Sequence, residues 1–290
     1  MAALATGATA AAAAATAWLV KDGVARAVTS SGADMVRSLE KCVYTGLRTF
    51  RGRPVSLQVH MSRLEHSAAE RGMAAPTVRA VQEAMRTALT AMGNADAVMM
   101  LATDGEQLLT HAKPIPPRPR PPVLAGITHV DRAYGEVKDS AWVFERDALA
   151  WPPGANELII VDKNGQVLEG TSSNVFVVKD DALYTAGGHI LSGSIRRLVL
   201  RLCSELNLPV RLEPPNWADR AGWQDVFITS TSRLVLPVDV LLGDAGETLK
   251  FESRHPIVAR LDSAILAELE GEARWLDESA PEPAAPPTSQ

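Results

Sequence analysis

The sequence predicts an α/β chain with α+β character, made of a smaller N-terminal α/β domain and a larger C-terminal domain of strands and helices. An apolar fraction of 46% in 290 residues is ample for a core. Segments with the period of a strand and with the period of a helix occur in both halves. Six prolines among residues 113–122 exclude a helix interior and a central strand there. We therefore expect an interdomain linker at 114–122, between domains at 23–113 and 123–276.

Both ends of the chain differ in composition from the rest. Residues 2–17 are almost entirely Ala and Thr, without the basic region and strongly apolar core of a signal peptide or the Arg and Ser of a transit peptide. We expect residues 1–22 to be a flexible Ala-rich extension and the Pro- and Ala-rich tail at 277–290 to be disordered. A cytoplasmic location is the expectation, and organelle targeting by the Ala-rich stretch is the alternative.

Hydrophobic spacing predicts the elements of the first domain. Val43 to Phe50 is a strand, and Arg51-Gly52-Arg53-Pro54 turns it into residues 55–57 as a hairpin. Asp104-Gly105 is a hairpin turn between two further strands. Helices are expected at 60–71 and from Pro76-Thr77 onward, with Val78, Val81, Met85 and Leu89 on one face. The two remaining strands are expected at 96–103 and 107–111.

The second domain is expected to contain more strands than helices. Lys163-Asn164-Gly165 and Lys179-Asp180-Asp181 are turns between strands. Strands are expected at 123–130, 158–162, 167–168, 174–178, 182–185, 209–212, 225–229 and 234–241. Helices are expected at 142–149, 195–206 and 255–269, with a short helical turn near Trp217.

Charge and cysteine content restrict the kinds of partner. The net charge is −5 with Lys and Arg scattered, so neither a nucleic-acid surface nor a polybasic membrane patch is expected. Cys42 and Cys203 lie far apart without metal-ligand spacing, which argues against a disulfide framework or a metal site and suits a reducing compartment. Small-molecule partners fit best.

The stretch from Lys138 to Arg196 spaces three kinds of chemistry along one segment. The amine of Lys138 can form an imine with an aldehyde, which burial favours by lowering a lysine pKa. Glu169 ends a hydrophobic strand, so its carboxylate could pair with a ring nitrogen. Ser194 and Ile195 open a helix whose first N–H groups attract a phosphate. An aldehyde, a pyridine nitrogen and a phosphate together describe pyridoxal 5′-phosphate (PLP).

With these residues the chain resembles the fold type IV PLP enzymes, the class-IV aminotransferases, which include branched-chain aminotransferases, D-amino-acid transaminases and aminodeoxychorismate lyases. The resemblance covers residues 44 to 238. Its blocks are the lysine block at 136–140, His60-Met61-Ser62-Arg63-Leu64, Glu169 to Phe176, Leu191 to Arg196, and Phe227 to Ser232 with Pro237-Val238.

The resemblance implies a role for each candidate site residue. Lys138 forms the imine and moves the proton between the substrate and the cofactor, and Glu169 holds the pyridine nitrogen protonated. Arg63 grips the phosphate through its guanidinium, together with Ser194, Ile195, Thr231 and Ser232. Arg196 supports the loop instead of touching the phosphate. Candidate substrate contacts are Tyr44, Arg48, Trp142 and Ser173.

The resemblance also implies a barrel-like C-terminal domain, a homodimer and transamination between an amino acid and a 2-oxo acid. The chain departs from it at Val143, where many relatives carry a tyrosine. It also departs at 108–113, where the Arg-x-His carboxylate trap of D-amino-acid transaminases is absent or rebuilt. We therefore expect branched-chain L-amino acids as substrates. The alternatives are an aminodeoxychorismate-type lyase that releases pyruvate, a D-amino-acid transaminase and a non-catalytic binding protein of the same fold.

Overall fold

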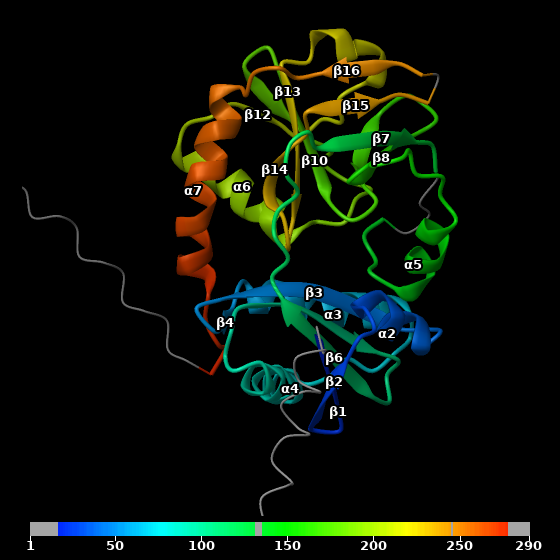
Figure 1. The fold of residues 1–290 in the computed structure, drawn as a ribbon, viewed down its shortest axis with the longest axis vertical. Helices are drawn as coiled ribbons and strands as arrows, with labels where there is room; N and C mark the ends of the chain where they lie inside the picture. The colour runs from blue at the N-terminus through cyan, green and yellow to red at the C-terminus, as the bar shows by residue number, and fades with distance from the viewer. Residues whose placement is uncertain (1–16, 131–134, 245, 278–290) are drawn as a thin grey trace, which may run out of the picture.

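The computed structural model describes residues 17–130, 135–244 and 246–277, and their strands form two sheets (Figure 1). The first sheet has the strand order β2-β1-β6-β5-β3-β4. Its strands are β1 (Ala17–Lys21), β2 (Val24–Val28), β3 (Val43–Phe50), β4 (Arg53–Pro54), β5 (Ala97–Thr103) and β6 (Leu108–Pro114). Every pairing in this sheet is antiparallel.

The hairpin of β1 and β2 corrects the expected flexible extension over residues 1–22. Residues 17–21 form β1, which pairs with β2 on one side and β6 on the other. The turn uses Asp22 and Gly23, both with positive φ. Ala17 and Val20 are buried, so this Ala-rich stretch has enough apolar side chains to join the sheet. Residues 1–16 lie outside the described residues.

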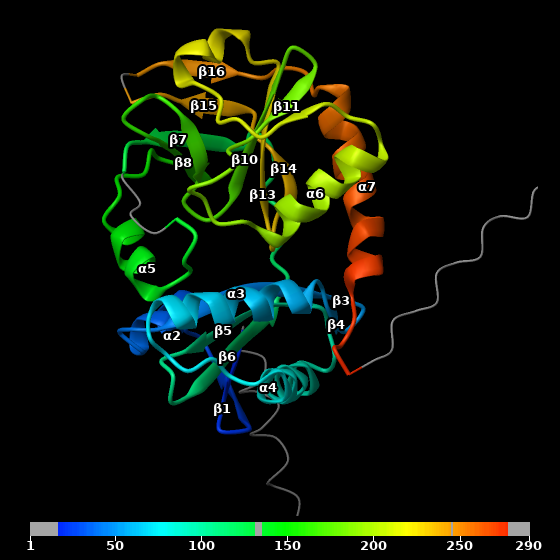
Figure 2. The same ribbon diagram turned by 180° about the vertical axis from the view of Figure 1, so that it is seen from behind.

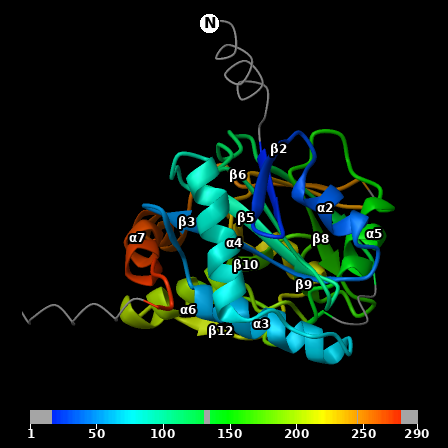
Figure 3. The ribbon, with the colours of Figure 1, turned by 90° about the horizontal axis from the view of Figure 1, so that it is seen from below.

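The alternation of β3 separates the two faces of the first sheet. Val43 and Leu47 face the helices α3 (Leu57–Glu70) and α4 (Val78–Ala91), which pack on the outer face. Tyr44 packs on the other face, against α2 (Gly32–Ser38) and α5 (Ser140–Asp147). Figure 3 shows α4 crossing the strands on the outer face. The two faces of the first sheet therefore contact different helices, and Tyr44 lies on the face that α2 and α5 cover.

Helix α2 was not anticipated from the sequence. It begins with a capping box in which Ser31 and Asp34 bond each other's backbone N–H groups. Seven residues are too few for a clear helical period, whereas the expected helices of this domain match α3 and α4.

The second sheet has ten strands among the described residues. Its main order is β12-β11-β10-β9-β8-β7-β15-β16, and β13 with β14 branches from β10. The strands are β7 (Leu124–Thr128), β8 (Glu157–Val161), β9 (Val167–Gly170), β10 (Asn174–Lys179), β11 (Ala182–Tyr184), β12 (Val210–Arg211), β13 (Asp225–Ser230), β14 (Leu234–Pro237), β15 (Val240–Leu242) and β16 (Thr248–Lys250).

Residues 234–241, expected as one strand, are divided between two. Strand β14 ends at Pro237, and Val238 still donates its N–H to Val226 O of β13 at 2.9 Å. The chain then turns, and β15 pairs with β7 and β16. Branching and switching of this kind let one set of strands surround an apolar core that includes Ile159, Val175 and Ile228.

Two helices cover the side of the second sheet. Helices α6 (Ser194–Glu205) and α7 (Pro256–Glu272) pack on a core that contains Phe176 and Phe227, whose rings stack 4.8 Å apart. A short 3-10 helix, η1 (Trp217–Gly222), follows β12. Figure 2 shows α6 and α7 side by side on this flank.

Helix α7 connects the two sheets. It runs down the side of the molecule, and Arg274 donates its N–H to Pro54 O at 3.1 Å (Figure 1). Trp275 is buried in the core of the first sheet, with the Arg86 guanidinium 3.9 Å from its ring centre. Residues 274–276, expected in the second domain, thus pack on the first sheet. Within the described ranges, no helix is long and apolar enough to cross a membrane.

Candidate active site

Most of the predicted site residues line one cavity of about 250 Å³ between the two sheets. Those that line it are Tyr44, Arg63, Lys138, Trp142, Glu169, Ser173, Ser194, Ile195, Thr231 and Ser232. Arg48 is the exception. It is buried on β3, and its guanidinium reaches Thr231 O at 3.4 Å without lining the cavity.

Lys138 is held against the start of β3 by backbone hydrogen bonds. Its carbonyl accepts from Tyr44 N at 3.0 Å, and Ser140 N donates to Cys42 O at 2.8 Å. The N–H of Lys138 donates to Ser67 Oγ on α3 at 3.1 Å. The segment before α5 therefore acts as a short extra strand, and the amine lies 4.7 Å from the centre of the Tyr44 ring.

Glu169 lies at the end of β9 and is buried. Its carboxylate accepts the N–H of Leu191 at 3.0 Å. Its strand neighbour Asn174 holds the same loop, donating to Leu191 O at 2.7 Å and accepting from Gly193 N at 3.2 Å. The strand end thus fixes both the carboxylate and the loop that leads to α6.

The N-terminus of α6 faces the cavity through Ser194 and Ile195. A Cβ at Gly193 would lie 2.1 Å from Asn174 Oδ1, so only glycine permits this close approach. The first N–H groups of a helix have no partner within it, which suits an anion. Arg63 comes from α3 to the same loop and donates to Ser192 O.

Burial lowers the pKa of Arg63 to about 10, so its guanidinium stays charged at neutral pH. His60, one turn earlier on α3, bonds Thr45 Oγ1 at 2.9 Å. Burial and the nearby charges of Arg63 and Lys138 hold the His60 pKa well below its ordinary value. His60 is therefore neutral and adds no charge to this end of the cavity.

The loop after β13 supplies hydroxyls at the opposite wall. Thr231 donates its hydroxyl to Gly46 O at 3.1 Å, which ties this loop to β3. Thr229 also lines the cavity, and its buried hydroxyl has no hydrogen-bond partner among the described residues. A buried polar atom without a partner is costly, so it favours a polar ligand at this wall.

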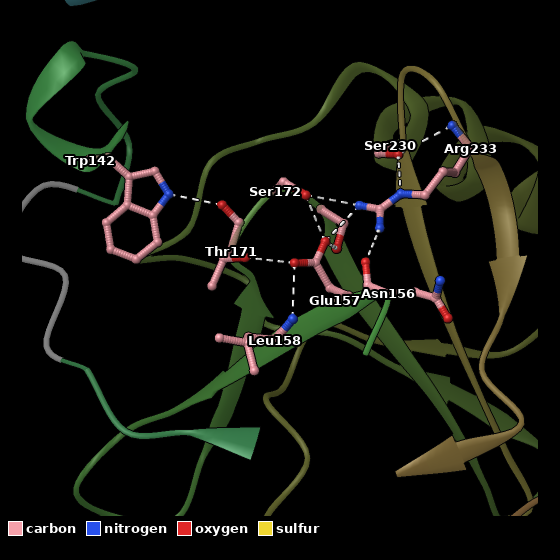
Figure 4. Close-up of polar contacts among 9 residues, drawn as sticks. Trp142, Asn156, Glu157, Leu158, Thr171, Ser172, Ser230 and Arg233 are labelled. Atoms are coloured by element: carbon pink, nitrogen blue, oxygen red, sulfur yellow. Dashed lines mark hydrogen bonds and ion pairs between the residues drawn. The ribbon is translucent and has the colours of Figure 1, made fainter. Parts of the chain in front are cut away.

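Two predicted residues take part in a network that the sequence did not indicate. Trp142 donates its indole N–H to Thr171 O at 2.8 Å, and Ser173 donates its hydroxyl to Glu157 at 2.8 Å. Glu157 is fully buried and also accepts from the hydroxyls of Thr171 at 2.6 Å and Ser172 at 2.8 Å (Figure 4).

Arg233 completes this network. Its guanidinium binds Glu157 at 2.6 Å and Ser172 Oγ at 3.0 Å (Figure 4). Burial alone would raise the pKa of Glu157, but the charge of Arg233 and the hydroxyl donors outweigh it and hold the pKa below its ordinary value. The Ser172 hydroxyl, in the loop after Glu169, thus bonds both members of the Glu157–Arg233 ion pair. The pair therefore joins this loop to the loop that carries Thr231 and Ser232. Glu157 begins a strand and Arg233 lies in a turn, so no spacing in the sequence connects them.

The region expected to carry or to replace a carboxylate trap lies on β6. His111 is buried and bonds Ser30 O at 2.9 Å, and it does not line the cavity. Val143 does line the cavity. Arg196 donates to Ala186 O at 2.7 Å and supports the loop before α6, as predicted.

The two cysteines take no part in the site. Both are buried and unpaired, and burial raises the pKa of Cys42 to about 11 and of Cys203 to about 12. Their thiols are therefore protonated at neutral pH.

The cavity suits PLP on its own chemistry. Lys138, the Glu169 carboxylate, the start of α6 and the orphaned Thr229 hydroxyl line a single space. An amine suits the aldehyde of PLP, a carboxylate suits its pyridine nitrogen, and a helix start with a free hydroxyl suits its phosphate.

Comparisons with known proteins agree with this chemistry. The family model described as amino-transferase class IV matches residues 42–241, which is more than half of the chain. A D-alanine aminotransferase from Staphylococcus epidermidis is 24% identical over 70% of this chain and 80% of its own length. A probable branched-chain-amino-acid aminotransferase from Rickettsia felis is 26% identical over 76% of this chain and 83% of its own length.

The fold agrees as well. The crystal structure of a putative branched-chain amino acid aminotransferase from Thermotoga maritima superposes with a TM-score of 0.73 at 23% identity, over 91% of this chain and 100% of that one. The chain belongs to the class IV aminotransferases. It is accordingly a PLP-dependent enzyme that acts on small molecules.

Proposed function

We propose that this aminotransferase moves an amino group between a branched-chain L-amino acid and a 2-oxo acid. The observation that carries the proposal is the cavity that brings Lys138, Glu169 and the start of α6 together beside an apolar wall. Bound PLP supplies an aldehyde for the amino group and a ring that takes up the electrons left when the substrate loses a proton.

Lys138 is the residue that attaches the cofactor and carries the proton. Its amine lies against the Tyr44 ring, and the paired segment 138–140 fixes where the side chain starts. Held in this place, the amine would act as the base that takes the proton from the substrate Cα and as the acid that donates it to C4′ of bound PLP.

Glu169 and Arg63 serve the two ends of the cofactor. The buried Glu169 carboxylate pairs with the pyridine N–H and keeps that nitrogen protonated. Arg63, Ser194 and Ile195 bind the phosphate at the start of α6, while Thr231 and Ser232 bind it from the facing loop.

The apolar side of the cavity carries the substrate proposal. Val98, Met100 and Val143 line it from β5 and α5. An aliphatic side chain placed there leaves no polar group without a partner. Tyr44, Trp142 and Ser173 border the same space and remain the proposed substrate contacts. Arg48 acts through Thr231, which its guanidinium reaches.

The test follows the first half-reaction alone. The PLP-loaded enzyme is mixed with single amino acids without an acceptor, and the visible absorbance of the cofactor is followed by stopped flow as it converts to its amine form. Leucine, isoleucine and valine should bleach the band faster than D-alanine. Faster bleaching by D-alanine would overturn the L-specific proposal. If no amino acid bleaches the band while aminodeoxychorismate yields pyruvate, the enzyme is a lyase.

A further inference from the structure

The residue after Lys138 carries a carboxylate that does not line the cavity. Asp139 is the N-cap residue of α5, with an extended backbone at φ −120° and ψ 171°. An aspartate in this position usually accepts an N–H of the first helical turn. Among the described residues, the Asp139 side chain accepts no such bond. Its carboxylate therefore has a task other than capping α5.

Asp139 is bound by Arg71, the C-cap residue of α3. Arg71 Nε donates to Asp139 Oδ2 at 2.6 Å, and a second guanidinium nitrogen lies 2.5 Å from the same oxygen. The side chain of Asp139 is 12% exposed and that of Arg71 is 28% exposed, so water screens this ion pair only in part. The C-terminal end of a helix also favours a cation. The ion pair is thus well placed to hold the start of α5 to the end of α3.

The amine of Lys138 and the carboxylate of Asp139 lie on opposite sides of one extended segment. Asp139 forms a β-bridge with Val43 of β3, and Val43 packs against α3 on the outer face of the first sheet. Lys138 comes one residue earlier and points the other way, with its amine 4.7 Å from the centre of the Tyr44 ring. The carboxylate can therefore be anchored without entering the space around the amine.

The anchor belongs to a different half of the molecule from most groups that the lysine must meet. Glu169 lies on β9 and Ser194 begins α6, which belong to the second sheet and to the helices that cover it. Residues 138–140 are bonded instead to β3 and α3 of the first half. The place of the amine relative to the cofactor site accordingly depends on how firmly residues 138–140 are held.

We propose that Arg71 is a positioning residue for the aminotransferase reaction, which fixes Lys138 by clamping the next residue, Asp139, to the end of α3. The inference rests on the proposed role of Lys138. Backbone bonds to Ser67 and Tyr44 hold the segment at two points, and the Arg71–Asp139 clamp holds it at a third, away from the cavity. A displacement of about 1 Å at a reacting group can cost roughly a hundredfold in rate, so the third point matters.

The first test measures how fast Lys138 attaches the cofactor, and it needs no amino acid. The full-length protein without cofactor is mixed with PLP and quenched with borohydride at set times, and the labelled Lys138 peptide is quantified by mass spectrometry. Arg71→Gln and Asp139→Asn should each slow the labelling roughly 10-fold. Arg71→Lys should restore part of the rate, because an ammonium keeps the charge without the guanidinium geometry.

Pyridoxine 5′-phosphate separates the clamp from the rest of the site. It carries the ring nitrogen and the phosphate of PLP with an alcohol in place of the aldehyde, so it cannot react with an amine. Its affinity, measured by calorimetry, should be the same in the wild type, Arg71→Gln and Asp139→Asn, which also shows that both variants are folded. Loss of this affinity together with the labelling would mean that the ion pair supports the whole site, and the positioning role would be overturned.

Turnover should follow the labelling. In Arg71→Gln, kcat for the preferred amino acid should fall roughly 10-fold with KM nearly unchanged, because the groups that bind the substrate stay in place. The double variant Arg71→Gln/Asp139→Asn should be no slower than either single variant, since both remove the same interaction. Additive losses would show that the two residues act separately, which contradicts a clamp.

The matched control is the ion pair of Arg37 and Asp147, which joins α2 to the last residue of α5. Its closest atoms are also 2.5 Å apart, and it ties the other end of α5 to the first half. Arg37→Gln should slow neither labelling nor turnover. An equal loss there would show that any contact of α5 has this effect, and the specific role of Arg71 would fail.

The labelling experiment also distinguishes the clamp from the proposed role of the lysine. Label on another lysine in the wild type would refute the role of Lys138, and the clamp with it. Label on Lys138 at the same rate in the wild type and in Arg71→Gln would overturn the clamp alone.

Discussion

Lys138 shows how much of this site depends on the backbone around a single residue. Its N–H is bound by Ser67 of α3 and its carbonyl by Tyr44 of β3. The first sheet and a helix packed on it therefore position a residue that lies between two strands of the second sheet, β7 and β8. The neighbouring Asp139 is paired with Arg71 at the end of α3, at 2.5 Å. The position of the amine therefore depends on the contact between the two halves of the molecule.

Replacing Lys138 with Ala should abolish turnover and leave the fold intact. The variant loses both the attachment point and the proton carrier, so kcat should fall by at least about a thousandfold. Borohydride should link the cofactor to the wild-type peptide that contains Lys138 and to no peptide of the variant, as read by mass spectrometry. Lys163→Ala, in an exposed turn, is the control. Labelling of another lysine in the wild type would refute the assignment.

At the scale of elements, two loops form the walls of the cavity, and one buried pair joins them. The loop after β9 carries Ser172 and the loop after β13 carries Thr231, and both are tied to Glu157 and Arg233. Arg233 lies in the turn before β14, and from there its guanidinium binds Glu157 and also Ser230 Oγ at 3.0 Å. The Glu157–Arg233 ion pair therefore holds both loops of the cofactor site in position.

Replacing Glu157 with Gln should weaken both folding and PLP binding. Breaking a buried ion pair by changing one partner costs about 3 kcal/mol of unfolding free energy. The loops then lose their shared acceptor, so PLP affinity should drop as well, measured by fluorescence titration. Asp225→Asn is the control. Asp225 is equally buried and forms an ion pair of 2.7 Å with Arg254, and neither residue lines the cavity. It should lose stability and keep PLP affinity. Unchanged PLP affinity in Glu157→Gln would contradict the idea.

The same carboxylate should be visible in the pH dependence of stability. The folded pKa of Glu157 lies below the ordinary value of 4.5, so the ionised form is the one that folding favours. Its contribution is fully present above that value and is lost as the pH falls through the lower folded pKa. Urea unfolding between neutral pH and pH ~3 should show a shallower acid loss for Glu157→Gln than for the wild type. Parallel curves would contradict the assignment.

For the whole molecule, we predict a homodimer as the active form. The cavity lies between the two sheets, and Tyr44 lines it from the first sheet. The family resemblance implies that a neighbouring subunit completes the pocket from this side. Sedimentation velocity at assay concentration should give a dimer, and dilution to the monomer should lower activity because the pocket becomes incomplete. A fully active monomer would contradict this.

The contact of α7 with the first sheet holds the two halves of the molecule together. Glu272, at the end of α7, accepts from Arg197 and Arg201 of α6 at 2.6 Å each and from Ser56 Oγ at 2.8 Å. Trp275 then enters the core of the first sheet. These bonds hold the two halves, and hence the walls of the cavity, in one arrangement.

The amino-acid sequence by itself determined the chemistry and most of the elements. The residue types at Lys138, Glu169 and Ser194, in that order, were enough to predict PLP, and periodicity placed α3, α4, α6 and β3 within a few residues, because those segments are long and strongly patterned.

Only the tertiary structure decided what depends on residues that are distant in the chain. It made β1 a strand of the first sheet, placed Trp275 in that sheet's core and paired Glu157 with Arg233. Spacing along a sequence reports what one segment can do with its own side chains. Which strand a short apolar segment joins, and which carboxylate neutralises a given arginine, depend on neighbours brought near by packing.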